Sequence, residues 1–244
     1  MILSVHQPQY LPWLGYFDKI DKSDGFVFLD NVQYKHREFQ NRNKIRVNLQ
    51  TPGGCLKGEG IWLSVPVVYK GHSRARIGQV LIDNGSDWQR KHWGSLKSAY
   101  SAAPFFKEHS AFFEEVYSRR WERLADLNIH IIKYILEYLK IDTPLYYESR
   151  IGTSLEATDR ILELCEKLKA DTYLSGSGGK DYLEEEKFSR AGIKLEYQHF
   201  VHPQYRQQFV KQEGDFLPYM SIVDLLFNEG PRSKDILCCH CEER

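Results

Sequence analysis

The sequence predicts an α/β protein with a mostly parallel, Rossmann-like sheet flanked by helices, a small antiparallel excursion and a helical insertion. Three observations predict this class. Two short apolar runs near the N-terminus, Ile2–Val5 and Gly25–Leu29, flank an amphipathic stretch. Residues 87–140 show only helical periodicity. In the last third of the chain, the pattern predicts a helix, a strand, a glycine turn, a second helix and a second strand, in that order. Helical crossovers make the strands that they join parallel, so the strands at both ends of the chain are assigned to one sheet.

Chain breakers and apolar periodicity set the element boundaries. Proline lacks an N–H and fixes φ, so Pro8 and Pro12 end the first strand, and Pro12 lies near the first turn of a helix. Apolar residues along 44–49 and 61–68 indicate an antiparallel pair joined by a turn at 51–54, with Pro66 at a sheet edge. The predicted elements, in order, are a strand over 2–5, a helix over 13–20, strands over 25–29, 44–49, 61–68 and 76–82, helices over 87–140 broken at Pro104, a helix from a capping box at 153–156 to Leu168, a strand over 171–174, a helix over 180–190, a strand over 193–197 and a buried helix over 215–229.

Composition excludes several classes of protein. The 244 residues carry 33 basic and 33 acidic side chains, whereas proteins that coat nucleic acid carry a basic excess. No apolar run approaches the roughly 18 residues that cross a bilayer, and no signal-peptide pattern is present. We therefore expect one α/β domain over residues 1–244 in the cytoplasm, with the helical insertion at 87–140. The sequence assigns no cofactor and leaves the oligomeric state open.

The C-terminal run Cys238-Cys239-His240-Cys241 holds three of the five cysteines. In a cytoplasmic protein these residues are reduced thiols. Zinc is the alternative interpretation, but structural zinc sites space their ligand pairs by two to four residues and need a second pair, which the sequence does not offer. We therefore assign no metal and expect a flexible tail over residues 235–244.

Polar residues cluster after four of the predicted strands. In an open α/β sheet, ligands bind beyond the carboxyl ends of the strands, because the loops there face a common crevice. If these four strands are parallel, a single rim collects all of the polar residues. The four groups are His6 with Gln7, Asp30 with Gln33 and Lys35, the turn Ser175–Gly179, and His199 with His202.

The residue types at this rim suit a small anionic substrate. His6 can accept a proton near neutral pH, and Asp30 can orient its imidazole or cap its own turn. Lysine and arginine bind phosphate, and a glycine turn that opens a helix can present backbone N–H groups to an anion. A structural histidine, a solvated basic loop and a ligand-free glycine turn are the alternative interpretations. The residues expected to bind substrate are Gln7, Tyr10, Tyr16, Gln33, Lys35, Asn41, Arg42, Asn43, Ser175, Gly176, Ser177, Gly178, Lys180, His199 and His202.

The run His6-Gln7-Pro8-x-Tyr10-Leu11-Pro12-Trp13-x-Gly15-Tyr16-Phe17-x-Lys19-Ile20 resembles the WbqC-like family, whose members are found with bacterial O-antigen and other surface-polysaccharide genes. Further segments are similar to the same family, so that the resemblance covers nearly the whole chain. These segments are Asp30–Lys35, Asn41–Ile45, Tyr173–Gly176 and Leu217–Gly230.

The resemblance implies a role in making a surface glycan and does not fix the reaction. Because such glycans often contain decorated amino sugars, we expect a transferase that moves an acyl or aminoacyl group onto a nucleotide-linked amino sugar. Its partners would be the nucleotide sugar and an activated acyl or aminoacyl donor. In this interpretation Lys35, Arg42 and the glycine turn hold phosphates, Tyr10 stacks on the ligand, and His6 relieves the attacking amine of its proton.

Two other functions stay open at this point. A nucleotidylyltransferase-like enzyme using ATP would have similar parts, but its paired H-x-G-H histidines are absent. A non-catalytic binding or assembly protein would tolerate replacement of His6 while needing Tyr10 and Trp13.

Overall fold

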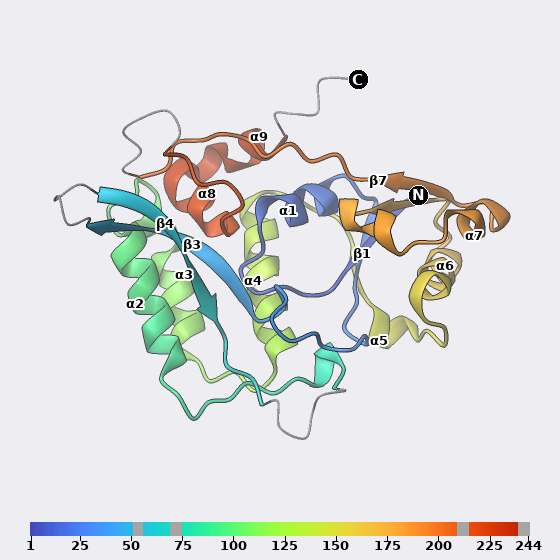
Figure 1. The fold of residues 1–244 in the computed structure, drawn as a ribbon, viewed down its shortest axis with the longest axis horizontal. Helices are drawn as coiled ribbons and strands as arrows, with labels where there is room; N and C mark the ends of the chain where they lie inside the picture. Colours follow the sequence, from blue (N-terminus) through green and yellow to red (C-terminus); the bar gives the residue numbers. More distant parts are fainter. Residues whose placement is uncertain (51–55, 69–74, 209–214, 239–244) are drawn as a thin grey trace.

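A five-stranded parallel sheet forms the centre of the protein in a computed structural model that describes residues 1–50, 56–68, 75–208 and 215–238 (Figure 1). The spatial order of its strands is β5-β2-β1-β6-β7, and every neighbouring pair is parallel. The chain winds outward from β1 to one side and then returns to the other side, so its direction switches between β1 and β6. The strands are β1 (Ile2–His6), β2 (Gly25–Phe28), β5 (Leu145–Tyr147), β6 (Thr172–Ser175) and β7 (Lys194–Tyr197).

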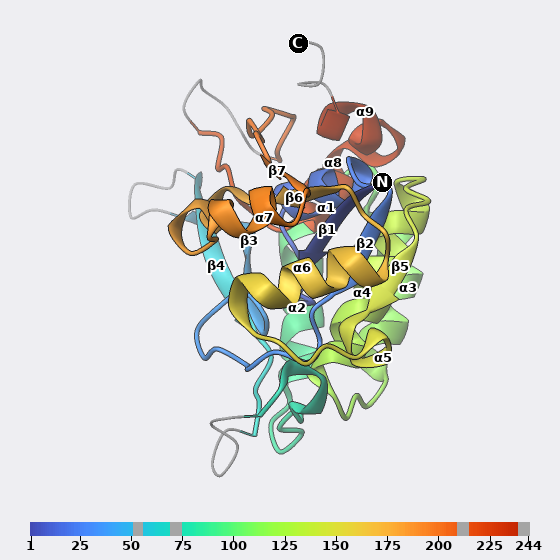
Figure 2. The same ribbon diagram turned by 90° about the vertical axis from the view of Figure 1, so that its right-hand side faces the viewer.

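Helices cover both faces of the sheet, as parallel strands joined by crossovers require. One face packs Leu3 and Val5 against α6 and α7, and Figure 2 shows these two helices lying in front of the strands. The other face packs Phe26 and Phe28 with Phe17 of α1 in the larger core cluster. The helices are α1 (Leu14–Asp21), α2 (Trp88–Tyr100), α3 (Phe106–Ser118), α4 (Leu124–Tyr138), α5 (Glu148–Ile151), α6 (Ala157–Lys167), α7 (Glu185–Arg190), α8 (Ile222–Glu229) and α9 (Ser233–Cys238), with 3-10 turns at Ile77–Gln79, Ser177–Asp181 and Gly230–Arg232.

A separate antiparallel hairpin pairs β3 (Arg42–Gln50) with β4 (Leu56–Ser64), which confirms the predicted antiparallel excursion. It packs against α2, the first helix of the 87–140 segment (Figure 1). The buried Asn128 of α4 donates from Nδ2 to the carbonyl oxygens of Pro8 (3.1 Å) and Gln40 (2.7 Å). The helical segment is thereby tied to the loops that follow β1 and precede β3. The turn predicted at 51–54 lies outside the described residues.

Several predicted boundaries are wrong. The segment 76–82 is not a strand, because Ile82 and Leu81 form single bridges to two different partners, Val67 and Arg123. Strand β5 was not predicted, since only three residues follow Pro144 before a short helix begins. The last predicted helix begins at Ile222 rather than at residue 215, with Ser221 as its N-cap.

Two helix starts in the last third also differ from prediction. The expected capping box at 153–156 does not form; instead Glu163 of α6 accepts the backbone N–H groups of Ser154 and Leu155. The helix predicted from Lys180 begins only at Glu185, after a 3-10 turn.

The C-terminal segment is partly ordered by packing. We expected a flexible tail from residue 235, but α9 extends to Cys238 with Ile236 and Leu237 buried. Residues 239–244 lie outside the described part of the chain. Within the described residues, no helix is long and apolar enough to cross a membrane.

Candidate functional site

Two adjoining cavities lie where the sheet changes direction. One has a volume of about 360 Å³ and the other about 230 Å³. Both are lined by His6, the last residue of β1, by Gly176 and Gly178, which follow β6, and by Lys19 of α1. We call this pair of cavities the switch-point crevice. It occupies the position at which open α/β sheets bind ligands.

His6 enters the crevice as a neutral imidazole. Its Nδ1 donates to the carbonyl oxygen of Gln7 at 3.1 Å, so Nε2 is the unprotonated acceptor. Burial and the positive charge of Lys19 lower the pKa of His6 to about 3. The ring also packs edge-on against Tyr16, with 5.1 Å between the centroids. At neutral pH this histidine is therefore a hydrogen-bond acceptor and a weak base.

Lys19 is the residue that sequence reasoning missed. Its side chain is 2% exposed, and Nζ donates to the carbonyl oxygen of Val5 at 3.0 Å. No acidic side chain among the described residues forms an ion pair with it, and burial lowers its pKa to about 7. The signal was present in the sequence, because Lys19 falls three residues after Tyr16 and one before Ile20, on the apolar face of α1.

The glycine turn Ser175–Gly179 packs closely against neighbouring residues and does not lead directly into an α-helix. Gly179 N donates to the carbonyl oxygen of Gly176 at 2.9 Å, so the turn closes on itself, and the five-residue 3-10 turn does not continue into α7. The turn therefore opens a 3-10 turn and not the α-helix that the sequence predicted. A Cβ at position 179 would lie 2.0 Å from Oγ of the buried Ser175, so a larger residue there would force the serine side chain to move. Ser177 is exposed and lines the larger cavity, whereas Lys180 is exposed but lines neither cavity, with Nζ 5.2 Å from the centroid of the Tyr197 ring.

Aromatic side chains line the larger cavity. Trp13 meets Phe200 edge-on at 5.3 Å between ring centroids, and Tyr16 donates from Oη to the carbonyl oxygen of Gln7 at 3.2 Å. Gln198, directly after β7, donates from Nε2 to the carboxylate of Asp18 at 2.6 Å. The loop after β7 is thereby fixed to α1, which brings the exposed His199 to the same cavity.

Other predicted binding residues have structural roles. Tyr10 is fully buried, with its hydroxyl 2.8 Å from His92 and 2.6 Å from Tyr117, so it does not present a face to a ligand. His202 uses both ring nitrogens on backbone, donating to Pro203 O and accepting from Tyr219 N. Asn41 and Asn43 are buried, and their Nδ2 atoms donate to the carbonyl oxygens of Val65 and Leu11. In each case hydrogen bonds within the protein use polar atoms of the side chain, although Oδ1 of Asn41 has no partner.

The loop after β2 leads away from the crevice. Asp30 accepts hydrogen bonds from the N–H (2.9 Å) and Oγ (2.5 Å) of Ser149, so it caps α5 and does not orient His6. Arg42 lies on the hairpin, 4.3 Å above the ring of Trp62. Lys35 is exposed, and the backbone of Gln33 bridges to Arg76. Asp30, Gln33, Lys35 and Arg42 are not among the residues that line either cavity of the crevice.

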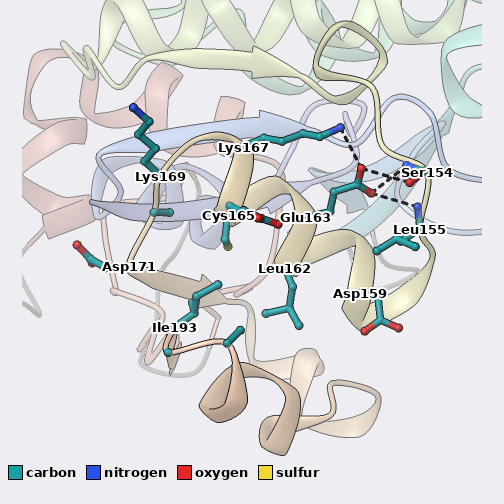
Figure 3. Close-up of a pocket in the computed structure, with 14 residues that line it drawn as sticks. Ser154, Leu155, Asp159, Leu162, Glu163, Cys165, Lys167, Lys169, Asp171 and Ile193 are labelled. Atoms are coloured by element: carbon teal, nitrogen blue, oxygen red, sulfur yellow. Dashed lines mark hydrogen bonds and ion pairs between the residues drawn. The ribbon is translucent and has the colours of Figure 1, made fainter.

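A larger hollow of about 960 Å³ lies beside α6, near the amino ends of β6 and β7 (Figure 3). Its polar groups satisfy one another, since Glu163 accepts from Ser154 N and pairs with Lys167 at 2.9 Å. These contacts lower the pKa of Glu163 to about 2, and burial raises the pKa of the Cys165 thiol to about 12. This hollow offers no activated group, so we place the candidate site in the smaller switch-point crevice.

Fold and site together define an α/β protein with a ligand-sized crevice at the switch point of a parallel sheet. The sequence model of the WbqC-like protein family matches residues 7–236, and the chain belongs to that family. It is 34% identical over 237 residues to the Uncharacterized protein Rv1507c of Mycobacterium tuberculosis, an alignment that covers 96% of each chain. No solved structure matches.

The described residues hold no group of three or more His, Cys, Asp or Glu side chains placed to bind a metal ion.

Proposed function

We propose that the protein is a transferase of surface-polysaccharide biosynthesis that moves an acyl or aminoacyl group from an activated donor to the amine of a nucleotide-linked amino sugar. The observation that carries the proposal is Lys19, a buried amine without an acidic partner among the described residues, in a crevice at the switch point of the sheet. Burying such a group costs stability, and strongly shifted pKa values are typical of functional sites. The family resemblance supplies the biosynthetic context.

The proposed step is aminolysis of the donor. The sugar nitrogen attacks the donor's carbonyl carbon, a C–N bond forms, and the bond from that carbon to the leaving group breaks with its electron pair going to the leaving group. The proton lost by the nitrogen goes to neutral Nζ of Lys19. A pKa of about 7 suits Lys19 to this task, since a general base works best when its pKa lies near the working pH.

His6 takes a different part from the one expected from the sequence. With its pKa near 3, the imidazole is too weak a base to compete with Lys19 for the proton. Its Nε2 is instead an acceptor that can orient a hydroxyl or amine of the substrate. The nucleotide portion would extend out of the larger cavity past the exposed Ser177, and the nearest exposed cation along the chain, Lys180, would offer a positive charge to phosphate.

The test begins with thermal shift measurements against sugar nucleotides, ATP and coenzyme A thioesters. A ligand at 100 times its dissociation constant adds roughly 2.7 kcal/mol to the free energy of unfolding. Stabilisation by an amino-sugar nucleotide identifies the acceptor, whereas stabilisation by ATP alone favours nucleotidyl transfer.

Turnover is then measured with the stabilising pair for Lys19→Met and for the exposed control Lys91→Met. We expect Lys19→Met to lower kcat about 100- to 10,000-fold with the acceptor still bound, and Lys91→Met to leave it unchanged. The wild-type rate should rise with pH through an apparent pKa near 7, because the neutral amine is the active form. Equal turnover in Lys19→Met and wild type would refute the base assignment, and binding without any turnover would favour a binding or assembly protein.

A further inference from the structure

We infer that the switch-point crevice holds the two reacting groups in separate chambers on opposite faces of the sheet, the sugar ring in the larger and an acyl group of limited length in the smaller. This inference rests on the proposed transfer and adds where each group binds and how long the acyl chain can be. The supporting observation is that the apolar residues lining the two cavities belong to two different core clusters of the protein.

The chambers lie on different faces. The smaller one is walled by Val5, Leu29 and Ile161, which belong to the core cluster beneath α6 and α7. The larger one is walled by Trp13 and Phe200, which pack against the cluster on the α1 side of the sheet. The carboxyl edge of β1 and β6 separates them.

The volumes decide what each chamber can hold. The 360 Å³ chamber has the volume of about twelve water molecules, taking about 30 Å³ for each. A hexopyranose has twelve non-hydrogen atoms, and because bonded atoms take less room than separate water molecules, the ring fits with space for a substituent. On the same measure the 230 Å³ chamber has the volume of about eight water molecules, which matches an acyl group of about seven carbons and excludes a nucleotide or a long fatty chain.

The chemistry of the walls agrees with this division. Val5, Leu29 and Ile161 give the smaller chamber one apolar wall for an acyl chain, because each buried methylene gains free energy by leaving water, whereas Gln7, Ser175 and the glycine turn line its other side. Aromatic rings pack against the C–H face of a pyranose, and the imidazole of His199 and the Oε1 atom of Gln198 beside them suit its hydroxyls, since Nε2 of Gln198 already donates to Gly15 and Asp18.

The residues shared by both chambers lie where the new bond must form. Lys19 lines each chamber, and its Nζ is 4.0 Å from the position that a Cβ would take at Gly176. An amine on a sugar in one chamber and a carbonyl carbon at the head of an acyl chain in the other therefore meet beside the proposed base. Gly176 carries no side chain that would close this passage.

The test uses N-acylglucosamine 1-phosphates with acyl chains of 2 to 12 carbons, which resemble the product of the proposed transfer. Affinities are measured by isothermal titration calorimetry with the full chain. We expect affinity to rise about fourfold per methylene up to about seven carbons and then to stop rising. Phe200→Leu should lower the affinity for every compound of the series by the same factor. It should not change the chain length at which the affinity stops rising.

Variants of the small chamber give the sharper result. Ile161→Ala removes three carbon atoms from its wall and should move the limit to about ten carbons. Leu162→Ala is the matched control, since it removes the same number of atoms from the next position of α6 but lines the separate 960 Å³ hollow. Because Ile161 is buried, Tyr182→Ala provides a second variant at a residue that lines the chamber and is 63% exposed.

The outcomes separate the two proposals. If no member of the series binds to the wild-type protein, the proposed transfer and the chamber assignment are both overturned. If the series binds but affinity rises steadily to 12 carbons, or if Leu162→Ala moves the limit while Ile161→Ala and Tyr182→Ala do not, only the two-chamber arrangement is wrong.

Discussion

Replacing Lys19 by methionine should stabilise the folded protein while disabling it. Burial lowers the pKa of Lys19 from 10.5 to about 7, and each pKa unit corresponds to about 1.36 kcal/mol. Holding the ammonium form in the folded state therefore costs about 5 kcal/mol. Methionine fills a similar volume without charge, but it leaves the carbonyl oxygen of Val5 without its 3.0 Å hydrogen bond, a loss of about 1–3 kcal/mol. The expected gain at pH 7 is about 2 kcal/mol.

The pH dependence provides the stricter test. Between pH 7 and 10.5 the unfolded chain holds a proton on Lys19 that the folded chain has lost, so the free energy of unfolding of the wild type rises with pH. Lys19→Met lacks this contribution, and its advantage should shrink steadily from pH 7 and reverse by about pH 10. Below pH 7 both states are protonated, so the difference between the proteins stays constant.

Urea denaturation at pH 6, 7, 8, 9 and 10 measures the effect, with the exposed Lys91→Met as control. At every pH, Lys91→Met should have the same free energy of unfolding as the wild type. A difference between Lys19→Met and wild type that does not change with pH, or a destabilised variant at pH 7, would show that the amine is not held near pKa 7.

Three further substitutions test the roles of neighbouring residues by urea unfolding and by substrate KM. Gly179→Ala should cost about 1–3 kcal/mol because its Cβ would meet Ser175, and the cost should be smaller in a Ser175→Ala background. Asp30→Ala should lose about 1 kcal/mol with its bonds to Ser149 and leave KM unchanged; a catalytic defect without loss of stability would contradict the capping role. Tyr10→Phe should lose about 1–2 kcal/mol with its buried hydrogen bonds, and any change in ligand affinity would contradict its place in the core.

The parallel sheet was predictable where apolar runs ended at strong chain breakers. The strand that ends at His6 is followed by two prolines, and the strand that ends at Ser175 is followed by glycines, so their ends were clear in the sequence. The strand Leu145–Tyr147 was not, because three residues are too few for a periodicity to show. Single β-bridges to residues distant in the sequence set the conformation of residues 76–82, and the local sequence pattern does not predict such bridges.

The position of the candidate crevice was predictable, but the residues that line it were predictable only in part. The rule that ligands bind at strand ends located His6 and the glycine turn correctly beside the crevice. It misplaced Tyr10 and Asn43, because polar side chains near a strand end can equally satisfy buried backbone and core partners, and sequence spacing does not distinguish these roles. Lys19 was overlooked because it belongs to a helix rather than to a loop.

The strand order also dictates when the crevice can exist during synthesis. β1 pairs early with β2, but its other neighbour, β6, begins only at Thr172. At about 5–20 residues per second, a ribosome needs roughly 7 to 30 s to add the intervening chain. During that interval the second edge of β1 has no strand partner, a state that invites wrong pairing. The crevice is complete only after β7 and the residues that follow it, Gln198–Phe200, have also been added, so a ligand cannot assist the earlier pairing of β1.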